Sequence, residues 1–140
     1  MAVERSFLDV SDAQGAAFFG TPDNGPVVML NLLRFREVAD YSHAPSLAPE
    51  GGTSGRDAYA HYMREMRPLL EASGGAVLFS GSASRFLIGP LDEIWDQVLL
   101  VQQASKASFL AFASDPKAQM ITAHRTAAIC DSRLLPITAE

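Results

Sequence analysis

The chain has 140 residues, of which 48% are hydrophobic and 19% are charged, and its formal net charge is −5. This length and composition suffice for one buried core, so we expect a single domain over residues 1–140. The acidic balance argues against nucleic acid as a partner, because phosphate binding requires a basic patch. No apolar run has the length of a membrane span or of a secretory signal, so neither is expected. The single cysteine, Cys130, excludes an internal disulfide, and a cytoplasmic location is predicted.

Residues 1–25 are expected to form a short helix followed by a turn. Ser11 is a typical helix N-cap residue, and Gln14 stands three positions later as its capping-box partner. The Asp-Asn-Gly sequence at 23–25 is typical of a turn. A strand is then predicted over 26–35, because this stretch consists mainly of apolar residues that favour strands.

Residues 36–54 are predicted to be a long loop insertion, because they contain two prolines and a glycine pair and show no periodicity. Loops longer than about 15 residues are usually lids, binding loops or disordered segments. The sequence leaves both function and disorder open here. A helix follows the loop, since Ser54 and Asp57 form a capping signature before apolar side chains recur at helical spacing. The glycines at 74–75 end this helix.

The second half of the chain contains three further strand patterns and a broken helix. Strand-forming residues predict strands over 76–89, 95–103 and 131–138, the first of them either straight or bent. A helix begins at Ser105 and is interrupted at 114–116, where Asp115 caps a further helical segment. Pro136 is typical of a sheet edge or a strand end.

Apart from the leading helix, the order of elements is β-α-β-β-α-β, which predicts an α+β, ferredoxin-like fold with both helices on one face of the sheet. Both alternating sets of side chains in 27–33 are mainly apolar, so the opposite face is expected to be apolar too. An exposed apolar face is unfavourable, and a second sheet packed against it would cover it. We therefore expect a homodimer whose sheets pair as a dimeric α/β barrel, although another partner could cover the same face.

Two segments resemble a known family, namely YAHYMREMRPLLEASGGAVLFSG at 59–81 and WDQVLLVQQASKASFLAFASDP at 95–116. Over residues 26–138 the chain resembles domain-of-unknown-function family 1330, within the dimeric α/β-barrel superfamily. The resemblance implies a ferredoxin-like fold and a dimer, and it implies no established reaction. The wider superfamily includes cofactor-independent monooxygenases, isomerases, haem-degrading enzymes and ligand-binding regulators, with a pocket between sheet and helices. The loop at 36–54 departs from the short form of the family.

The common catalytic and phosphate-binding motifs are absent from the sequence, which disfavours a hydrolase. His43, His61 and His124 lack metal-ligand spacing, so no metal site and no cofactor are expected. His43 and His61 are predicted to be solvated. His124 shares a helix face with Met120 and Ala127 and should point inward. There it is either a hydrogen-bonded core residue or the acid or base of a pocket.

Four other residues are candidates for ligand binding: Asn31, Arg34, Tyr59 and Tyr62. Alternation places Asn31 and Arg34 on opposite faces of their strand. An unpartnered buried amide costs about 1–3 kcal/mol, so Asn31 requires a protein, water or ligand partner. Arg34 either forms an ion pair at the rim or binds a carboxylate-bearing ligand. Tyr59 and Tyr62 either pack in the core or present their hydroxyls to a pocket.

Trp95 is expected in the core or at a dimer interface with its indole N–H bonded to an acceptor, and Asp96 is expected to be a solvated turn residue. The leading hypothesis is a homodimer that binds a small organic molecule between sheet and helices. One alternative is a cofactor-independent monooxygenase or isomerase, with His124 as the base. The other is a non-catalytic interaction module.

Overall fold

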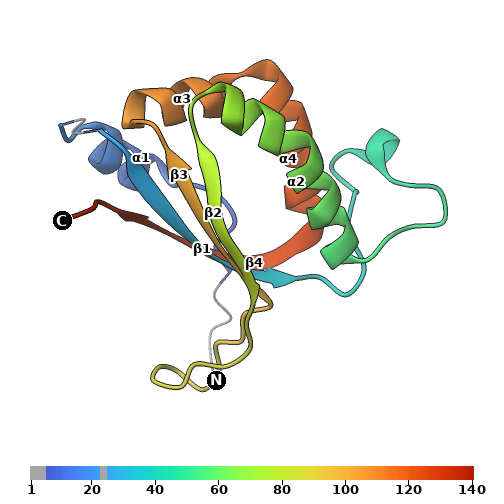
Figure 1. Cartoon of the computed structure of the whole chain (residues 1–140). Coiled ribbons are helices and arrows are strands. Elements are labelled where there is room, and N and C mark those ends of the chain that lie inside the picture. The colour runs from blue at the N-terminus through green and yellow to red at the C-terminus, as the bar shows by residue number, and fades with distance from the viewer. Residues whose placement is uncertain (1–5, 23–24) are drawn as a thin grey trace.

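A four-stranded antiparallel sheet forms the centre of the computed structural model, which describes residues 6–22 and 25–140 (Figure 1). The strands are β1 (Val27–Phe35), β2 (Ala76–Ser82), β3 (Gln97–Gln103) and β4 (Ile129–Ile137), and they lie in the order β2-β3-β1-β4. The helices are α1 (Asp12–Phe19), α2 (Gly55–Ala72), α3 (Lys106–Ser114) and α4 (Pro116–Ala128), with a 3-10 helix η1 (Pro45–Leu47). This order and pairing confirm the predicted α+β, ferredoxin-like fold with a leading helix.

The helices begin where their capping residues predict. The Ser11 hydroxyl accepts a hydrogen bond from the backbone N–H of Gln14, and the Ser54 hydroxyl accepts one from Asp57. Asp115 ends α3 and caps α4, which confirms the predicted break between the two helices. Each cap satisfies an N–H group that has no partner within its helix.

The strands differ from their predicted bounds in the segment between β2 and β3. β2 ends at Ser82 instead of continuing towards residue 89, and β3 begins at Gln97. Residues 83–96 form an arm that projects from the sheet, with a β-bridge between Arg85 and Ile94 near its base (Figure 1). β4 begins two residues earlier than predicted. Of the turn predicted at 23–25, residues 23 and 24 lie outside the described residues.

The loop at 36–54 is attached to the rest of the fold near both of its ends. Val38 forms a β-bridge with Ser54, and the N–H of Asp40 donates to the carbonyl of Ala127 at the end of α4 (2.9 Å). Tyr41 is buried and belongs to the hydrophobic core. These contacts favour a packed loop over the disordered alternative.

The core lies between the sheet and the helices α2 and α4. Its fully buried members include Leu33 of β1 and Ile129 of β4. Tyr59 of α2 belongs to the same cluster of buried side chains. Val27, Met29 and Leu33 are buried, whereas Arg34 is exposed, as strand alternation predicts. α1 packs at the start of α3, where the rings of Phe19 and Phe109 stack with their centroids 5.8 Å apart.

The opposite face of the sheet is apolar and open. Within the described part of the chain, α2, α3 and α4 all lie on the core side (Figure 1). The open face presents Phe79 of β2 and Leu135 of β4, which are 57% and 58% exposed, beside the partly exposed Leu30 and Leu100. We refer to this surface as the open sheet face. It agrees with the sequence-based expectation that both faces are apolar.

Two predictions about the start of β3 need correction. Trp95 is buried at 2% exposure, but its indole N–H finds no acceptor among the described residues, contrary to expectation. The guanidinium of Arg133 lies 4.9 Å from the centroid of its ring instead. Asp96 is not a solvated turn residue, because its carboxylate accepts a hydrogen bond from the backbone N–H of Phe35 (2.8 Å).

Candidate functional site

The two polar residues of β1 lie on opposite faces of the sheet and do not form one site. Asn31 pairs with Leu99 on the core face, and its side-chain amide donates to the carbonyl of Met29 in its own strand (3.2 Å). Arg34 is exposed near the end of the strand. That Arg34 binds a carboxylate remains a prediction. Such a site would lie on the other face of the sheet from Asn31.

Tyr59 and Tyr62 pack together on the inner side of α2. Their ring centroids lie 5.2 Å apart, and Tyr59 also contacts the ring of Phe35 at 5.4 Å. Burial raises the pKa of both hydroxyls, so both remain protonated at neutral pH. Tyr59 additionally reaches a surface groove, whereas Tyr62 belongs to the packing between helices and sheet.

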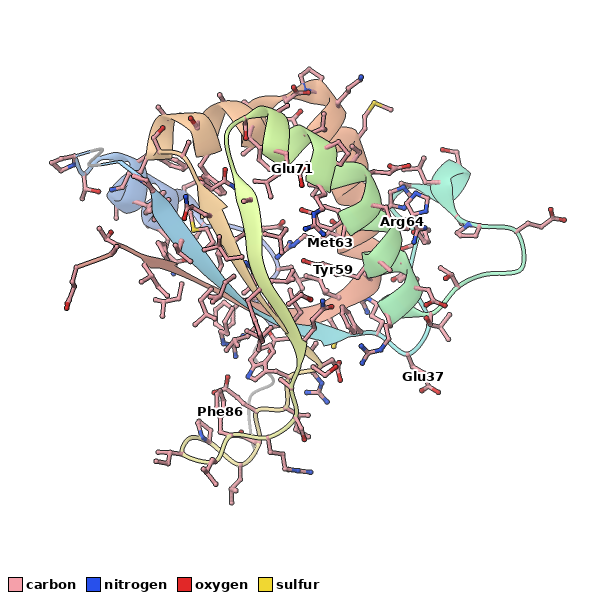
Figure 2. All side chains as sticks on the ribbon, viewed as in Figure 1. Glu37, Tyr59, Met63, Arg64, Glu71 and Phe86 are labelled. Carbon is pink, nitrogen blue, oxygen red and sulfur yellow. The ribbon has the colours of Figure 1, made fainter. Side chains whose placement is uncertain are left out.

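A groove with a volume of about 350 Å³ runs between α2 and the strands β2 and β3, and we call it the α2–β2 groove. The lining of the groove consists of Arg56, Tyr59, Ala60, Met63, Arg64, Arg67, Val77, Ser80, Gln97 and Leu99. Of these, Tyr59, Met63 and Arg64 of α2 are labelled in Figure 2. Three of these residues are arginines, and none carries a carboxylate. The groove therefore combines an apolar base with positive charge along α2.

The three arginines differ in their own contacts. Arg64 forms no ion pair within the described residues, and Arg56 lies over the ring of Phe35 at 5.0 Å from its centroid. Arg67 pairs with Glu71 (Nε–Oε1 3.3 Å), but both side chains are more than half exposed. Exposed ion pairs of this kind contribute little to stability, so Arg67 can readily exchange Glu71 for another anion.

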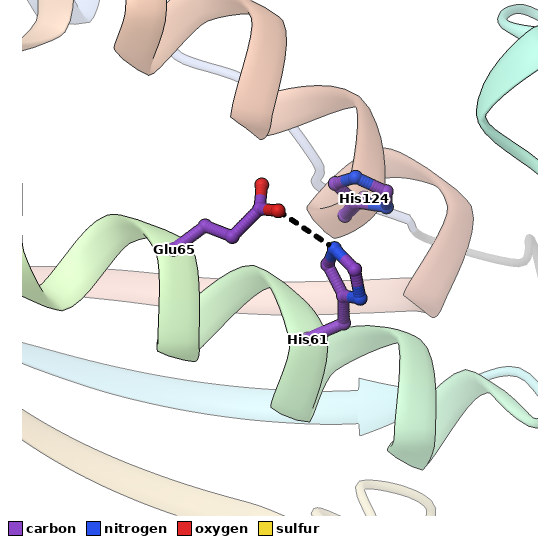
Figure 3. A group of neighbouring side chains, drawn as sticks. All are labelled: His61, Glu65 and His124. Carbon is purple, nitrogen blue, oxygen red and sulfur yellow. Dashed lines mark hydrogen bonds and ion pairs between the residues drawn. The ribbon is translucent and has the colours of Figure 1, made fainter.

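A second group of side chains joins α2 to α4 (Figure 3). His61 and Glu65 stand one helical turn apart on α2, with 3.0 Å between Nε2 and Oε1. The rings of His61 and His124 lie 4.2 Å apart between centroids. Burial, together with the neighbouring His61, lowers the pKa of His124, so its imidazole is neutral at pH 7. We call these three residues the His–Glu–His cluster.

The surroundings of His124 agree only in part with the sequence prediction. His124 and Ala127 are buried as expected, but Met120, predicted on the same face, is 69% exposed. His61 is not simply solvated, because it is half-buried against His124. Residue spacing does not reveal this contact, because the two histidines come from helices that are far apart in sequence.

Two residues beside His124 come from the loop at 36–54. The hydroxyl of Tyr41 lies 2.8 Å from His124 Nδ1, and the imidazole of His43 lies 3.1 Å from the carbonyl of Ala123. His43 is exposed as predicted. Tyr41 was missed by sequence reasoning, and the one signal available was that it is the single tyrosine in this loop, which contains no phenylalanine or tryptophan. Glu65 was also missed, although its spacing of four residues from His61 within a predicted helix was visible.

A pocket of about 320 Å³ opens beside the cluster, between the loop and α2, and we call it the loop pocket. Tyr41 and His61 belong to its lining, together with Asp57 and Arg64. The loop pocket therefore offers both charges and hydrogen-bonding groups next to a pair of imidazoles.

Among the helices that the structure describes, none is both long enough and apolar enough to cross a membrane.

The chain is similar over nearly its whole length to RPA0582, a protein of unknown function from Rhodopseudomonas palustris. The crystal structure of that protein is 36% identical, covers 97% of this chain and 98% of its own, and has a TM-score of 0.83. The methylated RPA0582 protein gives 36% identity, 96% coverage of each chain and a TM-score of 0.81. A dimeric ferredoxin-like protein of unknown function from Thermobifida fusca YX is 10% identical over 82% of this chain and 92% of its own. Its TM-score of 0.49 is too low to support a conclusion about this chain.

No family model matches the chain. No curated protein matches it either.

Proposed function

This chain belongs to the family of RPA0582 from Rhodopseudomonas palustris, and we propose that it is a homodimeric protein that binds a small organic anion in the α2–β2 groove. The family supplies the fold but no activity, since RPA0582 is itself described as a protein of unknown function. The observation that carries the proposal is the lining of the groove, in which three arginines and no carboxylate surround an apolar base.

The chemistry of the groove favours a carboxylate-bearing molecule. Guanidinium groups bind carboxylates through two parallel hydrogen bonds, and Arg64 has no ion-pair partner among the described residues. Val77 and Leu99 supply an apolar surface for the body of a ligand, and Tyr59 adds an aromatic edge. Small-molecule sites typically combine such a surface with a few polar groups that fix orientation. At the edge of the groove, the hydroxyl of Ser80 accepts a hydrogen bond from the side-chain amide of Gln97 (2.9 Å).

We propose binding rather than catalysis at this groove. None of its lining residues is a histidine, aspartate or glutamate, which are the usual groups for proton transfer. His124, the predicted base, belongs to the His–Glu–His cluster and does not line the groove. The cofactor-independent monooxygenase or isomerase reaction is therefore not part of this proposal.

The homodimer is supported by the open sheet face. A soluble monomer rarely exposes a large contiguous apolar patch, and a second copy of the chain would cover the face with an identical one. Membership of domain-of-unknown-function family 1330 is part of the same proposal. It is supported by the ferredoxin-like fold and by the two segments that resemble that family.

The ligand proposal is tested by thermal denaturation with a panel of aliphatic and aromatic carboxylates and their amides. A ligand that binds the folded chain raises the melting temperature in a saturable manner. We expect at least one carboxylate to do so and its uncharged amide to fail. The double variant Arg64→Gln/Arg67→Gln should lose the effect.

Arg85→Gln is the matched control, because Arg85 lies in the arm at 83–96 and not in the groove. It should respond to the carboxylate as the unaltered chain does. A panel without any stabilising carboxylate, or a stabilisation that persists in the double variant, would contradict the proposal.

A further inference from the structure

The His–Glu–His cluster has the composition and placement of a metal site. We propose that His61, Glu65 and His124 bind a divalent transition-metal ion of the Zn²⁺ type between α2 and α4, apart from the α2–β2 groove. The ligand atoms of all three side chains lie within 4.8 Å of one another. Two imidazoles and one carboxylate form a ligand set that Zn²⁺ uses in proteins, and three protein ligands leave the fourth position open.

The cluster needs only small shifts of its side chains to coordinate an ion. Zinc–nitrogen and zinc–oxygen bonds of about 2.0–2.2 Å place tetrahedral ligand atoms about 3.4 Å apart. His61 and Glu65 already stand at 3.0 Å, with side chains that are 40% and 47% exposed and therefore free to adjust. Their separation of four residues on one helix points both groups to the same side. Helix α4 then supplies His124 from across the interface.

Tyr41 holds His124 in an orientation that suits coordination. Its hydroxyl oxygen lies 2.8 Å from Nδ1 of His124, and in the tautomer in which Nδ1–H donates this hydrogen bond, Nε2 keeps its lone pair for the metal ion. Histidines that bind metals generally make such a hydrogen bond through the nitrogen that does not coordinate. The buried position of His124 further limits movement of the ring. Tyr41 is therefore a positioning residue in this proposal.

The loop pocket provides space beside the open coordination position. It is bounded by His61 and Tyr41 and has a volume of about 320 Å³, which is enough for water and a small molecule. Arg64 and Asp57 also line it, so a ligand with both acidic and donor groups would find partners there. The pocket and the cluster are two independent observations that converge on His61.

The same contacts would also arise in a metal-free helix interface with an exposed His–Glu pair, and a titration distinguishes the two. Untagged full-length protein is treated with a chelator, dialysed and titrated with Zn²⁺ by calorimetry, and with Co²⁺ by visible absorption. We expect one ion per chain and the absorption of tetrahedral Co²⁺. His61→Asn and Glu65→Gln should each weaken Zn²⁺ binding by at least about tenfold.

Two matched controls separate a specific site from general metal affinity. His43→Asn removes the nearby histidine of the loop, and Glu71→Gln removes a carboxylate from the same helix; both should bind Zn²⁺ unchanged. Because His124 is buried, it is left intact and followed by NMR, where its ring C–H resonances should shift on addition of Zn²⁺. Absence of Zn²⁺ binding, equal affinity in His61→Asn, or unchanged His124 resonances would each overturn the proposal.

Discussion

At the scale of single residues, Asp96 shows how one side chain extends a strand ladder. The pairing of β1 with β3 ends at Leu33, and the carboxylate of Asp96 accepts the next free N–H, that of Phe35 (2.8 Å). Asp96→Ala would leave this partly buried N–H without a partner. We expect the free energy of unfolding to fall by about 1–3 kcal/mol in urea denaturation. Asp92→Ala, at an exposed position of the arm, should cost nothing measurable, and equal losses in the two variants would disprove the argument.

The tyrosines predict how stability depends on alkaline pH. Burial raises the pKa of Tyr59 and Tyr62 in the folded chain, whereas the unfolded chain ionises them near pH 10. The unfolded state then releases protons that the folded state retains. The contribution of the two protonated tyrosines to the free energy of unfolding is therefore complete below about pH 10 and is lost as the pH rises further. In an alkaline titration, the ultraviolet absorption of tyrosinate and the loss of native circular dichroism should change together. Ionisation of all tyrosines near pH 10 in a chain that keeps its native circular dichroism would contradict this expectation.

At the scale of elements, Gly55 marks the point where β1, α2 and α4 meet. A Cβ atom at Gly55 would stand 2.1 Å from the carbonyl oxygen of Arg36 and 2.6 Å from that of Ala128. Both obstacles are backbone atoms that cannot rotate away. The N–H of Gly55 also donates to the carbonyl of Arg36 (3.1 Å), so the elements are held together at this point.

Substitutions at two helical glycines should consequently have opposite effects. Gly55→Ala is expected to destabilise the chain by about 1–3 kcal/mol or more, because of the clash. Gly15→Ala in α1, where the added Cβ meets only the Val10 side chain at 3.3 Å, should stabilise it by up to about 1 kcal/mol. In thermal denaturation, the melting temperature of Gly55→Ala should fall below that of the unaltered chain, and that of Gly15→Ala should rise above it. A tolerated Gly55→Ala would mean that the three elements do not meet as described.

The elements that the sequence predicts well are those with local signals. Caps at Ser11, Ser54 and Asp115 place three helix starts, and the alternation in β1 separates buried from exposed residues. The strand predicted over 76–89 extends past the end of β2 because residues 83–88 include the apolar run Phe86–Leu87–Ile88, and only the absence of a partner strand distinguishes this part from a strand. The His–Glu–His cluster and the partner of Asp96 depend on tertiary contacts. Residue spacing within one segment carries no information about such contacts.

At the scale of the whole molecule, the proposed dimer depends on the open sheet face and on the arm. The arm carries Leu87 and Ile88, which are 100% and 93% exposed, and it extends beyond the sheet that bears Phe79 and Leu135. Both the arm and the sheet face therefore carry apolar side chains that are exposed in the single chain. A face-to-face dimer would cover the sheet, and we expect the arms to lie at its margin.

Light scattering tests this assembly. The unaltered chain should have twice the mass of the 15.0 kDa chain, and Phe79→Glu/Leu135→Glu should reduce it to one chain mass. Both side chains are largely exposed in the single chain, so the charges should disrupt assembly rather than folding. Leu110→Glu, at an exposed position of α3, is the matched control and should remain dimeric. A monomeric unaltered chain would rule out the dimer.

The contacts of the loop at 36–54 also determine whether this insertion could be trimmed. The carbonyls of Ala127 and Ala128 belong to the last turn of α4, where helices lack internal donors, and the N–H groups of Asp40 and Arg36 bind them at 2.9 and 2.8 Å. Halving a loop returns only about 0.6 kcal/mol of closure entropy, whereas each orphaned buried carbonyl costs about 1–3 kcal/mol. A shortened chain that loses these donors would thus be less stable, which makes the loop a terminal support of α4 as well as the wall of a pocket.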